Sequence, residues 1–307
     1  MSHIHRTGTP LPRPRRRYVA VLVSGLLLAG GLVAAAGPAT ASVPVRVLDV
    51  TAHDNCDQTP ACGDWYDLSS HTLTAGLIDV RLHNAGHVDH QVQFVRLHEG
   101  VTADSYLAAL IATQGGAALA LADAMGGSNA VGAGEDQETW VNLPAGNYVA
   151  MCFQDGPPNS GPPHLFKGMY DSFTVTGQGN SAHPPVPVRG TISAYSFGFN
   201  LPATIDGHGV YRFVNTASAD THELTLLKLA PGKHAQDVLS WLADPASGPP
   251  PFSSAGGFGA LAPGGQGWVR LDLAAGDYVA VCFVPDDEAP HLPHIELGMH
   301  VEFSVAG

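Results

Sequence analysis

The stretch YVAMCFQDGPPNSGPPHLFKGM, residues 148–169, is nearly repeated downstream as YVAVCFVPDDEAPHLPHIELGM, residues 278–299. When the two stretches are aligned, a Cys, a His and a Met fall in the same register, while most residues between them differ. The positions are Cys152, His164 and Met169 in the first copy and Cys282, His294 and Met299 in the second. A spacing that is kept while its surroundings change indicates side chains that act together.

The repeat extends well beyond these two stretches. VNLPAGNYVAMCF matches LDLAAGDYVAVCF, and GMYDSFTVTG matches GMHVEFSVAG. Upstream, LIDVRLHNAGHVDHQVQFVRL matches GVYRFVNTASADTHELTLLKL, which aligns His90 with His222. The period is far longer than that of a solenoid, so the pattern indicates two tandem domains. We predict domains at 42–176 and 188–307, joined by a linker at 177–187 that is rich in Gly, Pro and small polar residues.

Each repeat reads mostly as β-structure. Segments such as VYRFVN and LTLLKL alternate or run apolar over the length of a strand. A helical insertion interrupts each repeat: TADSYLAALIATQGGAALALADAM, opened by the N-cap candidate Thr102, and HAQDVLSWLA, which a Gly/Pro-rich segment follows. With seven or eight strands per repeat, the predicted fold class is all-β, as two tandem Greek-key β-sandwiches.

The N-terminus has the pattern of a targeting segment. Arg13, Arg15, Arg16 and Arg17 come shortly before the apolar run YVAVLVSGLLLAGGLVAAAG, and PATAS follows with a small-residue cleavage site after Ala41. We predict that residues 1–41 are a signal peptide, of the Sec type or, because of RRRYV, of the twin-arginine type. The expected location is secreted or extracytoplasmic, and an uncleaved membrane anchor is the alternative.

Charge narrows the choice of partners. Cleavage after Ala41 removes five of the 14 Lys and Arg and none of the 27 Asp and Glu, which leaves a net charge of −18. Such a chain is not expected to bind nucleic acid or anionic membrane surfaces, nor to insert in a membrane after cleavage. A cationic partner or a metal ion fits the charge.

Four Cys occur in the chain. Cys56 and Cys62 lie close together in CDQTPAC, and we expect them to form a local disulfide in an oxidising compartment. One Cys then remains in each repeat, at positions 152 and 282. A bridge between these two is an alternative, which requires equivalent strand ends to come within disulfide reach.

The spaced residues form one set of possible metal ligands in each repeat. Two His and one Cys in a plane, with a weak axial Met, make a blue-copper site. In each repeat a His follows a strand ending in Asn, the Cys ends the next-to-last strand, and a loop then supplies His and Met. The predicted copper ligands are His90, Cys152, His164 and Met169 in the first repeat and His222, Cys282, His294 and Met299 in the second.

Each repeat resembles a cupredoxin, the family of plastocyanin. The resemblance covers nearly all of residues 45–307 apart from the helical insertions, and it implies a β-sandwich that holds copper at one end, usually for electron transfer. The matching residues are Asn84…His90, Tyr148…Cys152 and HLFKGM in the first repeat and Asn215…His222, Tyr278…Cys282 and HIELGM in the second.

One loop departs from the small electron carriers of this family. Eleven residues separate the Cys from the following His in both repeats, whereas the small carriers have only a few. In the second repeat His291 competes with His294, which we prefer because it keeps the H-x-x-x-G-M spacing. Comparably long loops occur in two-domain copper nitrite reductases, but those enzymes have a His directly before the Cys, where Met151 and Val281 stand here. The paired H-x-H and H-C-H motifs of multicopper oxidases are also missing after residue 41.

Three hypotheses follow for the function. The first is an exported copper-binding protein for electron transfer or copper carriage, whose partner would be a redox or copper-exchange protein. The second is a metal-free extracellular β-sandwich that serves as a binding or structural module, because a lone buried Cys or Met is more often core filler than a ligand. The third is an enzyme, for which no sequence motif argues.

Overall fold

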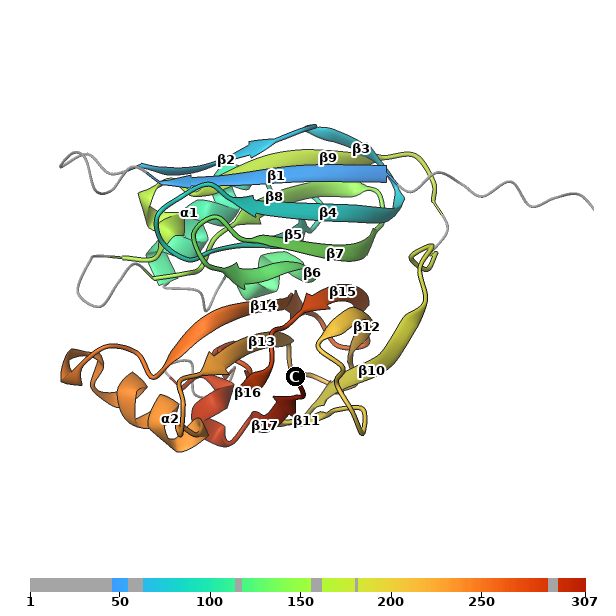
Figure 1. The fold of residues 1–307 in the computed structure, drawn as a ribbon. Coiled ribbons are helices and arrows are strands. Elements are labelled where there is room, and N and C mark those ends of the chain that lie inside the picture. Colours follow the sequence, from blue (N-terminus) through green and yellow to red (C-terminus); the bar gives the residue numbers. More distant parts are fainter. Residues whose placement is uncertain (1–45, 55–62, 114–117, 156–161, 180–181, 287–291) are drawn as a thin grey trace, which may run out of the picture. The chain divides into compact units, whose positions relative to one another are not determined.

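The computed structural model describes residues 46–54, 63–113, 118–155, 162–179, 182–286 and 292–307, and all of these belong to one compact unit. The predicted signal peptide and the predicted Cys56–Cys62 disulfide lie outside the described residues. Within the described ranges the chain is predominantly β-structure, so the predicted fold class is confirmed (Figure 1).

The first repeat contributes strands β1 to β9, one α-helix and two short 3₁₀ turns. Their bounds are β1 (Arg46–Asp54), β2 (Asp64–Leu68), β3 (Thr72–Thr74), β4 (Gly76–Asn84), β5 (His90–Leu97), α1 (Ala103–Thr113), η1 (Leu119–Leu121), β6 (Ala122–Val131), β7 (Asp136–Leu143), β8 (Gly146–Met151), η2 (His164–Lys167) and β9 (Tyr170–Thr176).

The second repeat has the same order of elements but lacks a counterpart of β3 among the described residues. Its elements are β10 (Val188–Tyr195), β11 (Gly198–Asn200), β12 (His208–Asn215), β13 (His222–Leu229), α2 (Ala235–Ala243), η3 (Pro245–Ser247), β14 (Phe252–Leu261), β15 (Gln266–Asp272), β16 (Gly276–Val281), η4 (His294–Leu297) and β17 (His300–Val305).

The strands form two sheets, and each sheet contains strands of both repeats. One sheet has the order β11-β10-β12-β15-β7-β4-β1-β2, and the other β17-β16-β13-β14-β6-β5-β8-β9-β3. The chain passes from one sheet to the other between β4 and β5, β6 and β7, and β7 and β8, which is how a sandwich of Greek-key type is connected.

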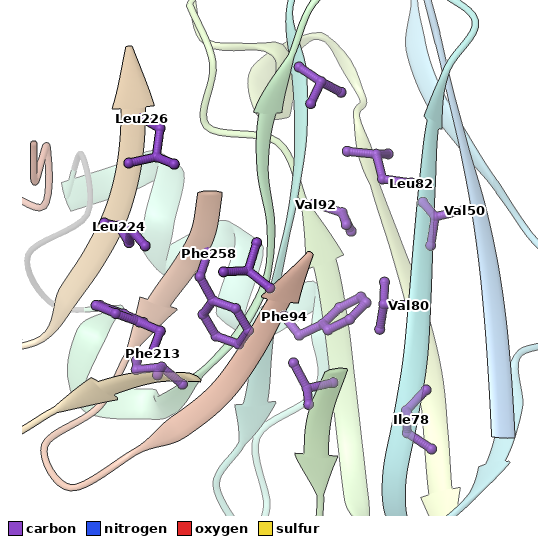
Figure 2. Packing of buried hydrophobic residues seen from close by; sticks show 14 of the residues in the cluster. Val50, Ile78, Val80, Leu82, Val92, Phe94, Phe213, Leu224, Leu226 and Phe258 are labelled. Atoms are coloured by element: carbon purple, nitrogen blue, oxygen red, sulfur yellow. The ribbon is translucent and has the colours of Figure 1, made fainter. Parts of the chain in front are cut away.

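One apolar core fills the space between the sheets. Figure 2 shows it running from Val80 in the first repeat through Phe94 and Phe258 to Phe213 in the second, and all four side chains are buried. Both site cysteines and the two predicted methionine ligands belong to the same buried cluster. The sites are therefore built into the core rather than placed on its surface.

The two repeats pair edge to edge around equivalent positions. In the β6–β14 pair Ser128 lies opposite Phe258, and in the β7–β15 pair Thr139 lies opposite Val269. Each pair is 130 residues apart, the same distance that separates the two site cysteines. The repeats are thus related by a local two-fold axis that passes through these pairs. The limits 42–176 and 188–307, with the linker 177–187, stay a prediction.

The first helical insertion is shorter than the sequence pattern predicts, whereas helix α2 covers nearly all of the predicted HAQDVLSWLA. Helix α1 begins as expected, because the hydroxyl of Thr102 accepts a hydrogen bond from the Ser105 N–H at 3.2 Å. Residues from Ala122 onward, however, form strand β6 instead of helix, and the Gly/Pro-rich segment of the second repeat ends in strand β14. Helix propensity was overridden here by the pairing of β6 with β5 and with β14, which the local pattern does not reveal.

Glycine makes this strand pairing possible. Gly127 in β6 and Gly257 in β14 have φ of +134° and +129°. A Cβ atom would lie 2.1 Å from the Val92 carbonyl oxygen at the first position and 2.0 Å from the Leu224 carbonyl oxygen at the second. Both glycines sit where the pairing register with β5 or β13 shifts, so they form bulges that no other residue fits.

We predict that Gly127→Ala destabilises the protein by at least about 2 kcal/mol more than Gly134→Ala. Both glycines have positive φ, but the space around Gly134 is open, so its substitution carries only the backbone cost. Urea unfolding of the two variants gives the comparison. Equal losses would contradict the close approach of β5 to β6.

Candidate metal centres

Strand pairing brings the first three predicted ligands together. His90 is the first residue of β5, and Cys152 directly follows β8. These strands are antiparallel, with Gln93 opposite Met151, so the start of β5 lies beside the end of β8. His164 begins η2, whose following residue Leu165 donates its backbone N–H to the Cys152 carbonyl at 2.9 Å. The long loop therefore returns to the same end of the sheet.

Three donor atoms converge in the first repeat. The Nδ1 atoms of His90 and His164 are 3.0 Å apart, and the Cys152 Sγ lies 3.9 Å from the first and 3.5 Å from the second. The point equidistant from these atoms is about 2.0 Å from each, which matches metal–nitrogen bonds of roughly 2.0–2.1 Å and is slightly short for metal–sulfur bonds of roughly 2.3 Å.

The second repeat has nearly the same triangle. The Nδ1 atoms of His222 and His294 are 3.1 Å apart, and the Cys282 Sγ lies 3.9 Å and 3.4 Å from them. All six side chains of the two triads are buried. Two imidazoles and one thiolate around a point in a closed, apolar site fit a type 1-like copper centre in each repeat.

The predicted axial ligands lie next to the triads along the backbone. The Met169 carbonyl accepts the Cys152 N–H at 3.2 Å, and the Met169 N–H donates to the His164 carbonyl at 3.0 Å. Met299 makes the same two bonds with Cys282 and His294, at 3.3 and 2.9 Å. Both Met side chains are fully buried. Their role as thioether ligands stays a prediction.

An asparagine fixes the approach to the first histidine in both repeats. Asn84 donates its amide to the carbonyls of Val88 and Val131, at 2.8 and 2.9 Å, and accepts the Gly86 N–H at 2.9 Å. Asn215 makes the equivalent bonds to the carbonyls of residues 220 and 261 and from the N–H of residue 217. These buried amides hold the loop that leads into His90 or His222.

Burial keeps the cysteines protonated when no metal is bound. It raises the pKa of the Cys152 thiol to about 12, against the opposing effect of the Gln91 and Gln154 N–H groups and the Tyr66 hydroxyl. Burial likewise raises the pKa of Cys282 far above its ordinary value. A thiolate is the form that binds copper, so each site must release a proton as the metal enters.

His164 and His222 are neutral and therefore able to act as ligands. Burial, together with the neighbouring His90 and Lys167, lowers the pKa of His164 to about 3. Burial and the neighbouring His294 lower the pKa of His222 to about 4. Neutral imidazole is the form that binds a metal ion, so these histidines can accept a cation without first losing a proton.

Three side chains near the triads are not among the predicted ligands. Asp54 accepts a hydrogen bond from the His90 ring, Tyr66 donates its hydroxyl to the Gln91 carbonyl, and Glu223 is buried beside His222. Only Glu223 carried a signal, namely its place next to a predicted ligand. Asp54 and Tyr66 reach the site through strand pairing and had none.

The structure bears on two alternatives that the sequence left open, namely a bridge between the two site cysteines and the choice between His291 and His294. Cys152 and Cys282 are both free thiols, so the predicted alternative of a bridge between them is wrong. His291 lies outside the described residues, and His294 occupies the second triad. No helix in the described part of the chain combines the length and hydrophobicity needed to cross a membrane.

The two centres lie at different ends of the paired strands. His90 pairs with Val131 on β6, and His222 pairs with Leu261 on β14. Val131 and Leu261 are each three residues beyond the Ser128–Phe258 pair, but in opposite directions because β6 and β14 are antiparallel. The sites are thus about 20 Å apart along the strand direction alone, so they do not share ligands.

Comparisons with known proteins return copper proteins among solved structures. An auracyanin from Roseiflexus castenholzii shares 19% identity over 38% of this chain and 96% of its own, with a TM-score of 0.25. An azurin from Methylomonas sp. strain J shares 15% over 43% and 98%, with a TM-score of 0.26. A multicopper oxidase shares 13% over 85% and 89%, with a TM-score of 0.23. No protein-family profile and no curated protein sequence matches the chain.

These likenesses are distant in both identity and TM-score, so the functional proposal rests on the geometry of the two triads. The described strands and the triad in each repeat form a duplicated β-sandwich of cupredoxin-like fold.

We predict that the metal-free protein loses stability as the pH falls from about 6.5 toward 4. In this window the unfolded chain binds protons at the ligand histidines, whereas folding keeps His164 and His222 neutral. The free energy of unfolding then falls by up to ~1.4 kcal/mol per pH unit for each histidine. Urea unfolding of the apo protein at several pH values measures the slope. A His164→Gln, His222→Gln double variant should show a shallower one, and an unchanged slope would contradict the prediction.

Proposed function

We propose that this protein binds one copper ion in each repeat and transfers electrons. The observation that supports this is the convergence of two imidazole nitrogens and a thiol sulfur within 3.9 Å in both repeats. When bound, copper would supply a one-electron couple between Cu⁺ and Cu²⁺. The protein would supply a rigid and buried donor set for it.

The donor set favours copper over other metals. Thiolate and thioether sulfur are soft ligands that suit copper, and imidazole suits both oxidation states. A structural zinc site closes its tetrahedron with four strong ligands, whereas each triad here offers three together with a thioether candidate. Because the ligand side chains are at most 2% exposed, substrate access to the metal is poor. This supports electron transfer rather than catalysis at copper.

Location and partner are part of the proposal. The N-terminal pattern at 1–41 supports export, where copper proteins of this kind would meet an oxidising environment. The net charge of −18 after cleavage supports a redox or copper-exchange partner with a basic contact surface. Copper carriage is the second candidate function, and the soft sulfur ligands that would hold Cu⁺ favour it.

Copper titration of residues 42–307 tests the proposal. We expect two equivalents of copper to bind and to produce an intense visible thiolate-to-copper band. Cys152→Ser should remove the first site and Cys282→Ser the second, so each single variant should bind one equivalent and the double variant none. Tight Cu⁺ binding without a coloured Cu²⁺ form would favour carriage. Failure to bind either ion stoichiometrically would leave a metal-free module.

The methionines can be tested in the same single-site proteins. We expect Met169→Leu, in the Cys282→Ser background, to bind copper but to have a higher reduction potential, because loss of a sulfur donor weakens the oxidised site more than the reduced one. Met299→Leu should do the same in the Cys152→Ser background. A redox titration followed by visible absorption measures both. Unchanged potentials would show that the thioethers are core filler.

A further inference from the structure

We propose that Asp54 is a positioning residue for the copper ligand His90, that Gly86 provides the space for it, and that the second repeat lacks this device. The first site would therefore bind Cu²⁺ in preference to Cu⁺ through a carboxylate–imidazole pair that has no counterpart at the second. This inference rests on the proposed function, since it concerns how one site holds its copper.

Asp54 is the last residue of β1 and is buried. Its Oδ2 lies 3.0 Å from Nε2 of His90, the ring nitrogen that does not face the triad. The same carboxylate accepts the N–H groups of His87 and Val88 at 2.6 and 3.3 Å, and its Oδ1 lies 2.9 Å from the His87 ring. Several donors thus hold the carboxylate in one position against His90.

This contact determines how His90 presents itself to a metal. A carboxylate accepts hydrogen bonds only, so His90 must carry its proton on Nε2, which leaves Nδ1 as the free donor atom. Nδ1 is the atom that lies 3.0 Å from the His164 nitrogen and 3.9 Å from the Cys152 sulfur. The hydrogen bond from His90 to Asp54 therefore fixes the tautomer and the ring orientation that place Nδ1 in the triad.

Gly86 is needed for the pair to fit. A Cβ atom at this position would lie 2.2 Å from Oδ2 of Asp54 and 2.7 Å from Nε2 of His90, which are the two atoms of the hydrogen bond. The backbone of Gly86 is not in the left-handed region. Glycine is therefore needed at position 86 because it has no side chain, and not because of its backbone freedom.

The second repeat differs at both positions. The Gly86 N–H donates to the Asn84 side chain, and the Ala217 N–H donates to the Asn215 side chain, so Ala217 is the counterpart of Gly86. Ala217 thus carries a methyl group where Gly86 has no room for one beside Asp54 and His90.

The residue in place of Asp54 follows from strand register. Ala52 lies opposite Asn84, and Ala194 lies opposite Asn215, so by count along the chain the counterpart of Asp54 is Ser196. Asp54 is still part of β1, whereas Ser196 lies in the turn after β10 and has no carboxylate. Accordingly, Nε2 of His222 is buried with no hydrogen-bond partner among the described residues.

The chemical consequence concerns the oxidised ion. A carboxylate on the far nitrogen makes an imidazole a stronger donor and adds a negative charge near the metal. Both effects stabilise Cu²⁺ more than Cu⁺, since the interaction grows with the charge of the ion. Removing such a partner typically lowers metal affinity by 10–100-fold.

The second site has its own buried carboxylate, which acts differently. Glu223 accepts the Phe283 N–H at 3.0 Å and the Thr225 hydroxyl at 3.1 Å, and neither oxygen is directed to the ring of His222 by a hydrogen bond in the described structure. Glu223 adds to the effect of burial in raising the pKa of Cys282. A fair test therefore compares variants of the first site with one another rather than one site with the other.

The test uses the full mature chain with Cys282→Ser, so that only the first site binds copper. Asp54→Asn keeps an oxygen that accepts the His87 N–H but removes the charge. We expect it to lower the affinity for Cu²⁺ at least about tenfold relative to that for Cu⁺, which corresponds to a rise in reduction potential of about 59 mV for one electron. Gly86→Ala should shift the potential in the same direction, because it displaces the carboxylate.

Two matched controls separate this effect from general damage. Asp136→Asn removes the carboxylate partner of the exposed His83, a similar pair away from the triad, and should leave the potential unchanged. Ala217→Gly, in the Cys152→Ser background, opens the same space at the second site and should also change nothing, because no carboxylate is there to enter it.

The outcomes distinguish this inference from the proposed function. If neither single-site protein binds copper, the copper function itself fails. If the first site gives its visible band but Asp54→Asn and Gly86→Ala leave the potential unchanged, the inference is overturned. A lowered melting temperature with an unchanged potential would assign Asp54 to loop structure alone and would also overturn it.

Discussion

The rest of this structure depends on the antiparallel pairing of two buried strands in each repeat, β5 with β8 and β13 with β16. This pairing sets the start of one strand beside the end of the other, so a His and a Cys that are 60 or 62 residues apart meet at one end of a sheet. Strands in the middle of a core keep their register firmly, because a slip of one residue would turn every buried side chain outward. This register therefore fixes the relative positions of the His and the Cys in each site.

Duplication has preserved the donor atoms but not their surroundings. The two triangles of nitrogen and sulfur differ by no more than about 0.1 Å in any side. Around them, the first repeat has Asp54 and Gly86, whereas the second has Ala217 and the buried Glu223. The ligand geometry and the environment of the ligands therefore differ independently between the two repeats, and two ions bound in these sites would have different surroundings.

Sequence reasoning succeeded where the pattern is local. The alternation of apolar residues predicted the strands, and the doubled register of Cys, His and Met predicted the ligand set, of which the His and Cys members converge in both repeats. It failed at β6, where glycines and alanines form a strand that pairs with β5 of the same repeat and with β14 of the other. No local propensity contains that information, since glycine in a strand usually weakens it.

By itself, the sequence determined the all-β fold, the tandem duplication and the identity of the donor atoms, because these depend on residue type and on spacing along the chain. Only the tertiary structure decided which carboxylate would touch a ligand and how the two repeats would join. Asp54 and His90 are 36 residues apart, and their contact exists only because β1 and β4 are in register and Gly86 has no side chain. Such contacts depend on a few tenths of an ångström between strands, which spacing along the chain does not specify.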